Sequence, residues 1–330
     1  MKKIRISIFT GGSGNVELAR NLCELNNKTD NISINFIING YDDGKSTGFL
    51  RKLVPGMLGP SDFRKNCSNT ILPNNQREET LKTILDYRIK NFQSYIKLVN
   101  KIKKKDKNYF EFIDLLPWNK YLKFIELINI FNNFISKKQF SKKEFLDISL
   151  GNILFVALFL QFDKNFNKTI KNFTEFFEIK HNILNVTDGK NLFLCGLANS
   201  GNILEDEVSI IHNKKKETIS DIFLLKEKLS SKNHKILNRQ KDIRKKRSYL
   251  NNLSVKPNLN SELKSTLKNS DIIIYGPGTQ NSSLYPSYLT KGLKEIILRS
   301  RAKKIFISNI FKDNDIVNES TSTIIDKFFY

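Results

Sequence analysis

The amino-terminal part of the chain alternates apolar and polar segments in an order that predicts a strand, a helix and a second strand. The run KIRISIF at 3–9 is short and rich in β-branched residues, and glycines follow it, as expected for a buried strand. Residues 16–25 place apolar side chains at helical spacing, and ISINFII at 32–38 is again a strand-like run. Strand, turn, helix and strand form a βαβ unit, and such units build parallel sheets.

The segment 76–147 departs from this order and predicts helices. Apolar positions from Leu81 to Val99 recur at helical spacing opposite a charged face, and residues 121–135 repeat the pattern. The apolar run NILFVALFLQF at 152–162 predicts a more fully buried helix that returns to the core.

The carboxyl-terminal part of the chain again predicts strands joined by turns and helices. Strand-like runs stand at 191–197 and 207–212, and the strongly apolar DIIIYGPG at 271–278 predicts a strand that ends in a glycine-proline turn. Residues 287–299 predict a helix, and KIFIS at 304–308 predicts a last strand.

Together these elements predict an α/β protein with a doubly wound, Rossmann-like and mostly parallel sheet. Residues 1–75 and 148–330 would form a nucleotide-binding α/β core, and residues 76–147 an inserted helical subdomain. In sheets of this kind, ligands bind beyond the carboxyl ends of the strands. The loops that follow the predicted strands are therefore the first places to look for chemistry.

Composition narrows the class of protein. Apolar residues make up 39% of the 330 residues, enough for a substantial core, and no apolar run has the length needed to span a membrane. The N-terminus lacks the apolar region of a signal peptide and the three cysteines have no metal-like spacing, so we expect a cytoplasmic protein. The net charge of +22 is spread along the chain, which favours anionic small molecules over nucleic acid as ligands.

The first candidate loop is TGGSGN at 10–15, which precedes a predicted helix. Glycine lets the backbone approach a phosphate closely, and the first turn of a helix directs free N–H groups to the same place. The pattern is not a full dinucleotide fingerprint, because Glu17 stands where the third glycine belongs. A tight structural turn is the alternative. The candidates for phosphate binding are Gly11, Gly12, Ser13 and Gly14.

The second candidate loop, GYDDGKSTG at 40–48, resembles the end of a P-loop but fails on spacing and on charge. Three residues instead of four separate its first glycine from the Gly-Lys pair, and two carboxylates precede that pair. Asp42 and Asp43 suit Mg²⁺ bridging to a diphosphate, or one general base beside one metal ligand. Because neighbouring residues of an extended chain point to opposite sides, we expect one of them to face a given ligand. The alternative is an Asx-turn that caps a helix.

The third candidate loop, YGPGTQNSS at 275–283, ends the most apolar strand. Its small hydroxyl side chains and backbone N–H groups suit an anion-binding nest, with a purely structural turn as the alternative. Between the second and third loops, Arg64 could make a bidentate contact with a phosphate, and Asp62 could act in the site or cap a helix. No arrangement of Ser, His and Asp suggests a catalytic triad, so we expect phosphate chemistry, which depends on positioning and charge.

Five motifs thus stand in order along nearly the whole chain: GGSG at 11–14, DDGKSTGFLR at 42–51, SDFRKN at 61–66, GN at 151–152 and GPGTQNSSLYPS at 276–287. This order resembles the superfamily of 2-phospho-L-lactate transferase (CofD) and the YvcK-like gluconeogenesis factors. That superfamily carries Gly-Gly-Thr-Gly, then Asp-Asp-Gly-Gly-Ser-Ser-Gly-Arg-Leu-Arg, then Gly-Asp-Ile-Arg-Asn, a Gly-Asn before a buried helix, and a late Gly-Pro-Gly turn.

The chain departs from that pattern within the candidate loops. Lys45 and Ser61 each replace a glycine, Lys65 is an additional residue between Arg64 and Asn66, and the last loop is several residues longer. A lysine at position 45 could neutralise the acidic pair and take the place of a metal ion.

The resemblance implies a set of site residues. The glycine loop would approach the nucleotide or its phosphates, and a metal ion or the acceptor would be held by Asp42, Asp43 and Asp62, the first two as metal ligands. The rest of the binding site would be made by Lys45, Ser46, Arg64, Asn66, Asn152, Gly276, Gly278, Thr279, Asn281, Ser282 and Ser283.

The resemblance implies two kinds of function. The first is a Mg²⁺-dependent transferase that moves a phospholactyl-type group from a nucleoside-diphosphate-linked donor to an acceptor hydroxyl. The second is a regulator of carbon or envelope polysaccharide metabolism that binds a nucleotide-diphospho-sugar without turning it over. In both, the partner is a nucleotide-linked small molecule, and the sequence is compatible with a homodimer.

Overall fold

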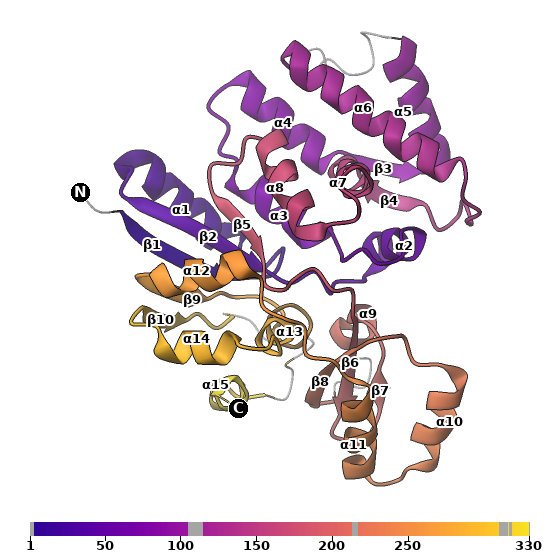
Figure 1. The fold of residues 1–330 in the computed structure, drawn as a ribbon, viewed down its shortest axis with the longest axis vertical. Helices are drawn as coiled ribbons and strands as arrows, with labels where there is room; N and C mark the ends of the chain where they lie inside the picture. Colours follow the sequence, from indigo (N-terminus) through magenta and orange to yellow (C-terminus); the bar gives the residue numbers. More distant parts are fainter. Residues whose placement is uncertain (1–2, 105–114, 213–216, 310–315, 317–318, 330) are drawn as a thin grey trace.

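The computed structural model describes residues 3–104, 115–212, 217–309, 316 and 319–329. Its central feature is a five-stranded sheet in which every pairing is parallel and the strand order is β10-β9-β1-β2-β5 (Figure 1). The predicted doubly wound α/β fold is therefore confirmed, because the chain adds strands first on one side of β1 and then on the other. The strands are β1 Ile4–Phe9, β2 Ile32–Ile38, β5 Asn182–Asn185, β9 Ile272–Tyr275 and β10 Lys303–Phe306.

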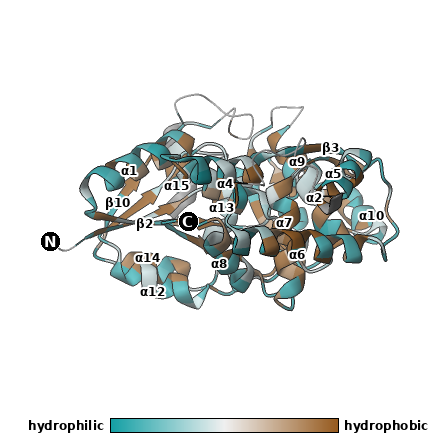
Figure 2. Cartoon of the chain, turned by 90° about the horizontal axis from the view of Figure 1, so that it is seen from above, coloured by the Kyte–Doolittle hydropathy of each residue, from teal (hydrophilic) through white to brown (hydrophobic). Residues whose placement is uncertain are grey.

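Helices cover both faces of this sheet. Figure 2 shows α1 (Val16–Thr29) on one face, and α12 (Ser261–Asn269) with α14 (Leu293–Arg299) on the other. Neighbouring strand residues accordingly enter two different cores: Ile8 packs in the cluster that includes α1, and Phe9 packs in the cluster that includes α12. Burial on both faces agrees with the continuously apolar carboxyl ends of β1 and β2 and with the apolar run of β9, although the buried Ser7 and Asn35 interrupt β1 and β2.

The segment 76–147 contains the helices that its periodicity predicts, together with a short antiparallel strand pair that it does not predict. The strands β3 and β4 pair through Ile89 and Ile148, and α7 follows β4 directly. Residues 105–114 lie outside the described part of the chain, and the division into a core and an insertion stays a prediction. The elements are α4 Gln76–Asp86, β3 Arg88–Asn91, α5 Phe92–Lys104, α6 Trp118–Ile135, β4 Leu146–Ser149 and α7 Leu150–Gln161.

A second, antiparallel sheet of order β7-β6-β8 lies beside the parallel one, at the lower right of Figure 1. The strand predicted at 191–197 is confirmed as β6, but the strand predicted at 207–212 is wrong, because Glu207–Ile211 form the short helix α9. The Asp206 carboxylate accepts from the backbone N–H of Ser209 and so begins this helix. This part consists of β6 Phe193–Ala198, β7 Ile203–Leu204, α9 Glu207–Ile211, β8 Ile219–Leu225, α10 Ser231–Arg239 and α11 Ile243–Leu253.

The helix predicted at 287–299 is interrupted. Gly292, with a φ of +84°, separates α13 (Tyr285–Tyr288) from α14, and a π-helical turn at Gln280–Leu284 precedes α13. Across the described ranges, no helix combines the length and the apolar character needed to cross a bilayer. The remaining helices are α2 Lys45–Leu53, α3 Ser61–Thr70, α8 Phe166–Phe176 and α15 Thr321–Phe329.

Candidate functional site

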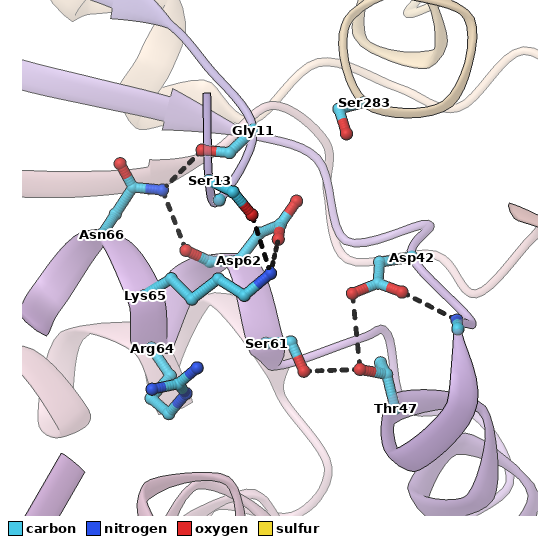
Figure 3. A network of polar contacts seen from close by, with 12 residues as sticks. Gly11, Ser13, Asp42, Thr47, Ser61, Asp62, Arg64, Lys65, Asn66 and Ser283 are labelled. Atoms are coloured by element: carbon cyan, nitrogen blue, oxygen red, sulfur yellow. Dashed lines mark hydrogen bonds and ion pairs between the residues drawn. The ribbon is translucent and has the colours of Figure 1, made fainter. Parts of the chain in front are cut away.

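The three predicted loops meet at the carboxyl edge of the parallel sheet. They follow β1 and its two neighbours, β2 and β9, at the place where the order of strand addition reverses. That reversal opens the crevice in which doubly wound proteins bind ligands. Below, the glycine loop is residues 11–14, the acidic loop is residues 40–48 and the β9 loop is residues 276–283. Figure 3 shows residues from all three loops facing one another.

Side chains of helix α3 hold the backbone of the glycine loop in place. Asn66 donates from its side-chain amide to the Gly11 carbonyl at 2.8 Å, and Asn69 donates to the Gly12 carbonyl at 3.3 Å. A Cβ atom on Gly14 would lie 2.6 Å from the Gly278 Cα, so the β9 loop packs directly against this glycine. In the described part of the chain, the backbone N–H groups of the glycine loop donate to no acceptor. The loop therefore presents unpaired donors at the edge of the sheet, as an anion site requires.

Asp62, at the start of α3, lies against this loop. A Cβ atom on Gly12 would clash with the Asp62 carboxylate, and one on Gly11 would lie 3.7 Å from Asp62 Oδ2. The ammonium of Lys65 lies 3.6 Å from Asp62 Oδ1 and 3.3 Å from the Ser13 hydroxyl (Figure 3). Burial raises the pKa of Asp62 to about 6, although Lys65 opposes the shift.

The two adjacent aspartates of the acidic loop point in different directions. Asp42 accepts from the Gly44 backbone N–H at 2.8 Å and from the Thr47 hydroxyl at 3.3 Å, and it faces the side of the site where Asp62 lies. Asp43 is buried and accepts from the backbone N–H of Glu207 at 3.0 Å. The ammonium of Lys228, in the loop after β8, lies 3.6 Å from the other Asp43 oxygen, Oδ2. Asp42 is thus directed to the crevice, and Asp43 to the antiparallel part of the molecule.

The sequence analysis missed Glu207, which brings a further carboxyl group to the acidic loop. Its Oε2 accepts from the same Gly44 backbone N–H as Asp42, at 3.0 Å. Burial, reinforced by Asp42, holds the pKa of Glu207 far above its usual range. The signal that could have located Glu207 is the capping pair of Asp206 and Ser209, which predicts the start of a helix. A helix at 207–211 orients the Glu207 side chain differently from the strand that we predicted there.

Arg51, the last residue of the motif at 42–51, was assigned no role of its own in the site by the sequence analysis. It is 5% exposed and donates to the carbonyls of Tyr41 and Asp42 at 3.0 and 3.1 Å. From its other nitrogen it donates to Asn191 Oδ1 at 2.8 Å and to the Leu192 carbonyl at 2.6 Å. Arg51 therefore ties the acidic loop to the start of the antiparallel sheet.

Two predicted ligand-binding cations lie elsewhere. The Arg64 guanidinium is buried, forms an ion pair with Asp86 and points away from the glycine loop (Figure 3). Lys45 is exposed at the first position of α2, with a φ of +28°, and its charge acts on Asp147. Within the described residues, no ion pair joins Lys45 to Asp42 or Asp43, and Ser46 beside it forms no side-chain hydrogen bond.

A chain of hydrogen bonds supports the acidic loop from the direction of α7. The hydroxyls of Thr47 and Ser61 are bonded to each other, and Asn152 donates to the Ser61 oxygen at 3.0 Å. The backbone N–H of Asn152 donates to Ser149 at 3.2 Å, which begins helix α7. In this way Asn152, predicted as a ligand residue, reaches Asp42 through Ser61 and Thr47.

The β9 loop brings a group of hydroxyls next to the glycine loop. Ser283 and Thr279 share a hydrogen bond of 2.7 Å, and Ser282 donates to Thr279 at 2.9 Å. A Cβ atom on Gly11 would lie 3.0 Å from the Ser283 hydroxyl and 3.7 Å from Asp62 Oδ2, so this loop packs against the glycine loop close to Asp62. Asn281 is buried, and the backbone N–H of Gly276 continues the sheet by donating to the Phe9 carbonyl at 2.9 Å.

Nowhere in the described ranges do three His, Cys, Asp or Glu side chains gather closely enough to hold a metal ion by themselves. Mg²⁺ usually needs fewer protein ligands, because one or two carboxylates and the phosphates of its substrate share it. Asp42 accepts from Gly44 and Thr47 and faces the crevice, so its carboxylate suits such a site.

The fold and the three loops define a class: doubly wound α/β proteins with a glycine loop and carboxylates at the switch point of the sheet. A family model described as 2-phospho-L-lactate transferase CofD matches residues 6–328. The chain belongs to this family, as its motifs predict.

Individual relatives support the same assignment. The gluconeogenesis factor of Halalkalibacterium halodurans is 24% identical over 314 residues, which are 95% of this chain and 69% of that protein. A relative from Aquifex aeolicus is 23% identical over 311 residues, which are 94% of this chain and 68% of that protein. A crystal structure of a UPF0052 family member from Bacillus halodurans matches all of this chain and 76% of its own length, with a TM-score of 0.64 and 21% identity. That structure shows that the fold is shared.

Proposed function

We propose that the protein transfers a phospholactyl-type group from a nucleoside-diphosphate-linked donor to the hydroxyl of an acceptor. One observation carries the proposal: the backbone N–H groups of the glycine loop, which have no acceptor among the described residues, lie against the Asp62 carboxylate, and the Asp42 carboxylate faces the same crevice. The N–H groups suit the negative charge of a diphosphate. The carboxylates suit a divalent cation and a proton that must be removed from the acceptor.

In the proposed step, the acceptor oxygen forms a bond to the distal phosphorus of the donor. The bridging P–O bond of the diphosphate breaks, and a nucleoside monophosphate leaves with the bridging oxygen. The hydroxyl proton passes to Asp62, which burial prepares for this task by raising its pKa to about 6. The glycine loop and Ser283 would hold the phosphates in line for this exchange.

Asp42 is the residue that would hold Mg²⁺, since Asp43 is directed to the backbone N–H of Glu207. Bound there, Mg²⁺ would neutralise part of the diphosphate charge. Arg51 fixes the backbone of Asp42 by donating to its carbonyl, so the carboxylate can keep one orientation through the step.

Release of nucleoside monophosphate from GDP-, UDP- and CDP-linked donors, with and without Mg²⁺, tests this proposal. Asp62→Asn should lower turnover by a factor of about 10² to 10⁴, since it removes the proton acceptor. Asp30→Asn is the matched control, because Asp30 is exposed and pairs with Lys3 at 2.7 Å, far from the loops. Full turnover in Asp62→Asn would contradict the mechanism.

A second function is favoured by the name of the Halalkalibacterium halodurans relative, a gluconeogenesis factor that matches 95% of this chain. In that case the same loops would bind a nucleotide-diphospho-sugar and report its level to a partner. Calorimetry separates the two functions. Tight binding that needs no Mg²⁺ and leads to no bond cleavage supports the regulator, whereas monophosphate release supports the transferase.

A further inference from the structure

We propose that Lys65 is the side chain that binds the phosphate groups of the ligand, and that it exchanges Asp62 for a phosphate when the ligand enters. This inference rests on the proposed nucleoside-diphosphate site and adds its main cation. Lys65 stands where we expected no ligand residue, between two positions of a family motif.

The first argument is charge. Asp42 and Asp62 bring two carboxyl groups to the mouth of the site, and their negative charge would repel a diphosphate without positive charge nearby. Backbone N–H groups alone carry partial charges. A cationic side chain within reach of the glycine loop would add to the positive charge that Mg²⁺ at Asp42 would supply.

The second argument is position. Arg64 is buried against Asp86, and Lys45 is exposed beside Asp147. Lys228 is bound to Asp43 and lies over the Phe193 ring, 5.7 Å from its centre. Among the described lysines and arginines, Lys65 alone contacts the glycine loop or pairs with Asp62, through the Ser13 hydroxyl at 3.3 Å and Asp62 Oδ1 at 3.6 Å.

The third argument is that Lys65 can change partners without moving its backbone. Its side chain is 37% exposed, while that of Asp62 is 9% exposed, so the ammonium lies at the outer side of the pair. An ammonium has three donors on a flexible stem, and at 3.6 Å its contact with Asp62 is loose. A phosphate placed over Gly12 and Ser13 would meet this ammonium, because Lys65 Nζ lies 3.3 Å from the Ser13 hydroxyl and the lysine stem packs against Gly12.

The test measures binding of GDP, UDP, CDP and inorganic pyrophosphate by calorimetry, in the 330-residue chain, with and without Mg²⁺. Lys65→Met removes the charge and keeps the length, and it should weaken binding of the tightest of these ligands about ten- to a hundredfold. Lys65→Arg keeps the charge and should stay much closer to the unchanged protein. Lys52→Met is the control. The side chain of Lys52, on α2, is 72% exposed and forms an ion pair of 2.8 Å with Glu144.

A second comparison asks whether Lys65 acts on the ligand or merely neutralises Asp62. In protein that already carries Asp62→Asn, Lys65→Met should still weaken binding about tenfold or more if the ammonium contacts phosphate. If Lys65 only offsets the charge of Asp62, Lys65→Met should have no effect in that protein. Thermal unfolding of each variant shows whether it is folded.

The outcomes separate the inference from the proposed function. If the unchanged protein binds nucleoside diphosphates and Lys65→Met binds them equally well, the inference is wrong and the proposed function stands. Equal losses of ligand affinity in Lys65→Met and Lys52→Met would also overturn the inference, since they would show that any lost positive charge weakens binding. If the unchanged protein binds none of these ligands, the proposed function fails and the inference fails with it.

Discussion

The glycine loop and the acidic loop follow neighbouring strands of one sheet, yet they use their polar groups in opposite ways. In the glycine loop, Asn66 and Asn69 donate to backbone carbonyls, while the N–H groups have no acceptor in the described part of the chain. In the acidic loop, each aspartate is already an acceptor within the protein, Asp42 from Gly44 and Thr47, and Asp43 from Glu207. The first loop is open to a ligand through its backbone, whereas the second is a scaffold that leaves one carboxylate edge available. Two polar loops at the same edge of a sheet can therefore have different roles, one in binding a ligand and one mainly in holding the structure together.

The largest expected effect comes from breaking the scaffold of the acidic loop. Arg51→Ala would leave the carbonyls of Tyr41, Asp42 and Leu192 without their buried donor. We expect the free energy of unfolding to fall by about 3 kcal/mol or more, as measured by urea denaturation. Arg20→Ala, at an exposed pair with Glu24, should change it by about 0.5 kcal/mol or less. An equal fall in the free energy of unfolding in both variants would show that Arg51 contributes no more to stability than an exposed arginine.

The next effect concerns the fit of the glycine loop. Gly14→Ala places a Cβ 2.6 Å from the Gly278 Cα and 3.0 Å from the Pro277 carbonyl oxygen, and backbone atoms cannot rotate away. We expect a cost of about 1–3 kcal/mol in stability and a clear loss of nucleotide binding.

Gly196→Ala is the matched control for this substitution. The nearest atoms to its Cβ lie 3.5 Å away, at an ordinary contact distance in the antiparallel sheet, so stability and binding should both be retained. Normal nucleotide binding by Gly14→Ala would mean that the glycine and β9 loops do not form one site.

The smallest of these effects separates the two adjacent aspartates. Asp42→Asn should reduce the gain in ligand affinity that Mg²⁺ provides by about tenfold, since a carboxylate binds Mg²⁺ better than an amide. Asp43→Asn should leave that gain nearly unchanged, because Asp43 faces Glu207 and Lys228. Titration of each variant with the same nucleotide at several Mg²⁺ concentrations measures the difference. A larger loss in Asp43→Asn would reverse the assignment of the two carboxylates.

The sequence was sufficient for the parallel sheet and for the meeting of the three loops. Runs such as FII at 36–38 and IIIY at 272–275 are continuously apolar because both faces of their strands are buried, and the rule for parallel sheets then brings the following loops to one edge. The opposite directions of Asp42 and Asp43 also agree with the alternation of an extended chain.

The parts that could not be predicted depend on contacts between distant segments. Glu207 and Gly44 are 163 residues apart, and no local pattern joins them. The five residues of α9 are too few to show helical periodicity, and their β-branched side chains favoured a strand until the cap at Asp206 was considered. Arg64 and Lys65 are adjacent, so the rotation of α3 decides which of them reaches the glycine loop, and packing against Asp86 and Gly151 fixes that rotation.

The central place of β1 in the sheet also governs the order in which the chain can fold. β1 pairs with β2 from the same end of the chain, but its other partner is β9, where Ile6 stands opposite Ile272. Pairing across so much sequence is slow, because the loop must close before its contacts are gained. During synthesis, the glycine loop must therefore wait for almost the entire chain before the β9 loop can cover it. A ligand that needs both loops would bind finished molecules and stabilise them, so its supply would set how much folded protein persists as well as how much of it is occupied.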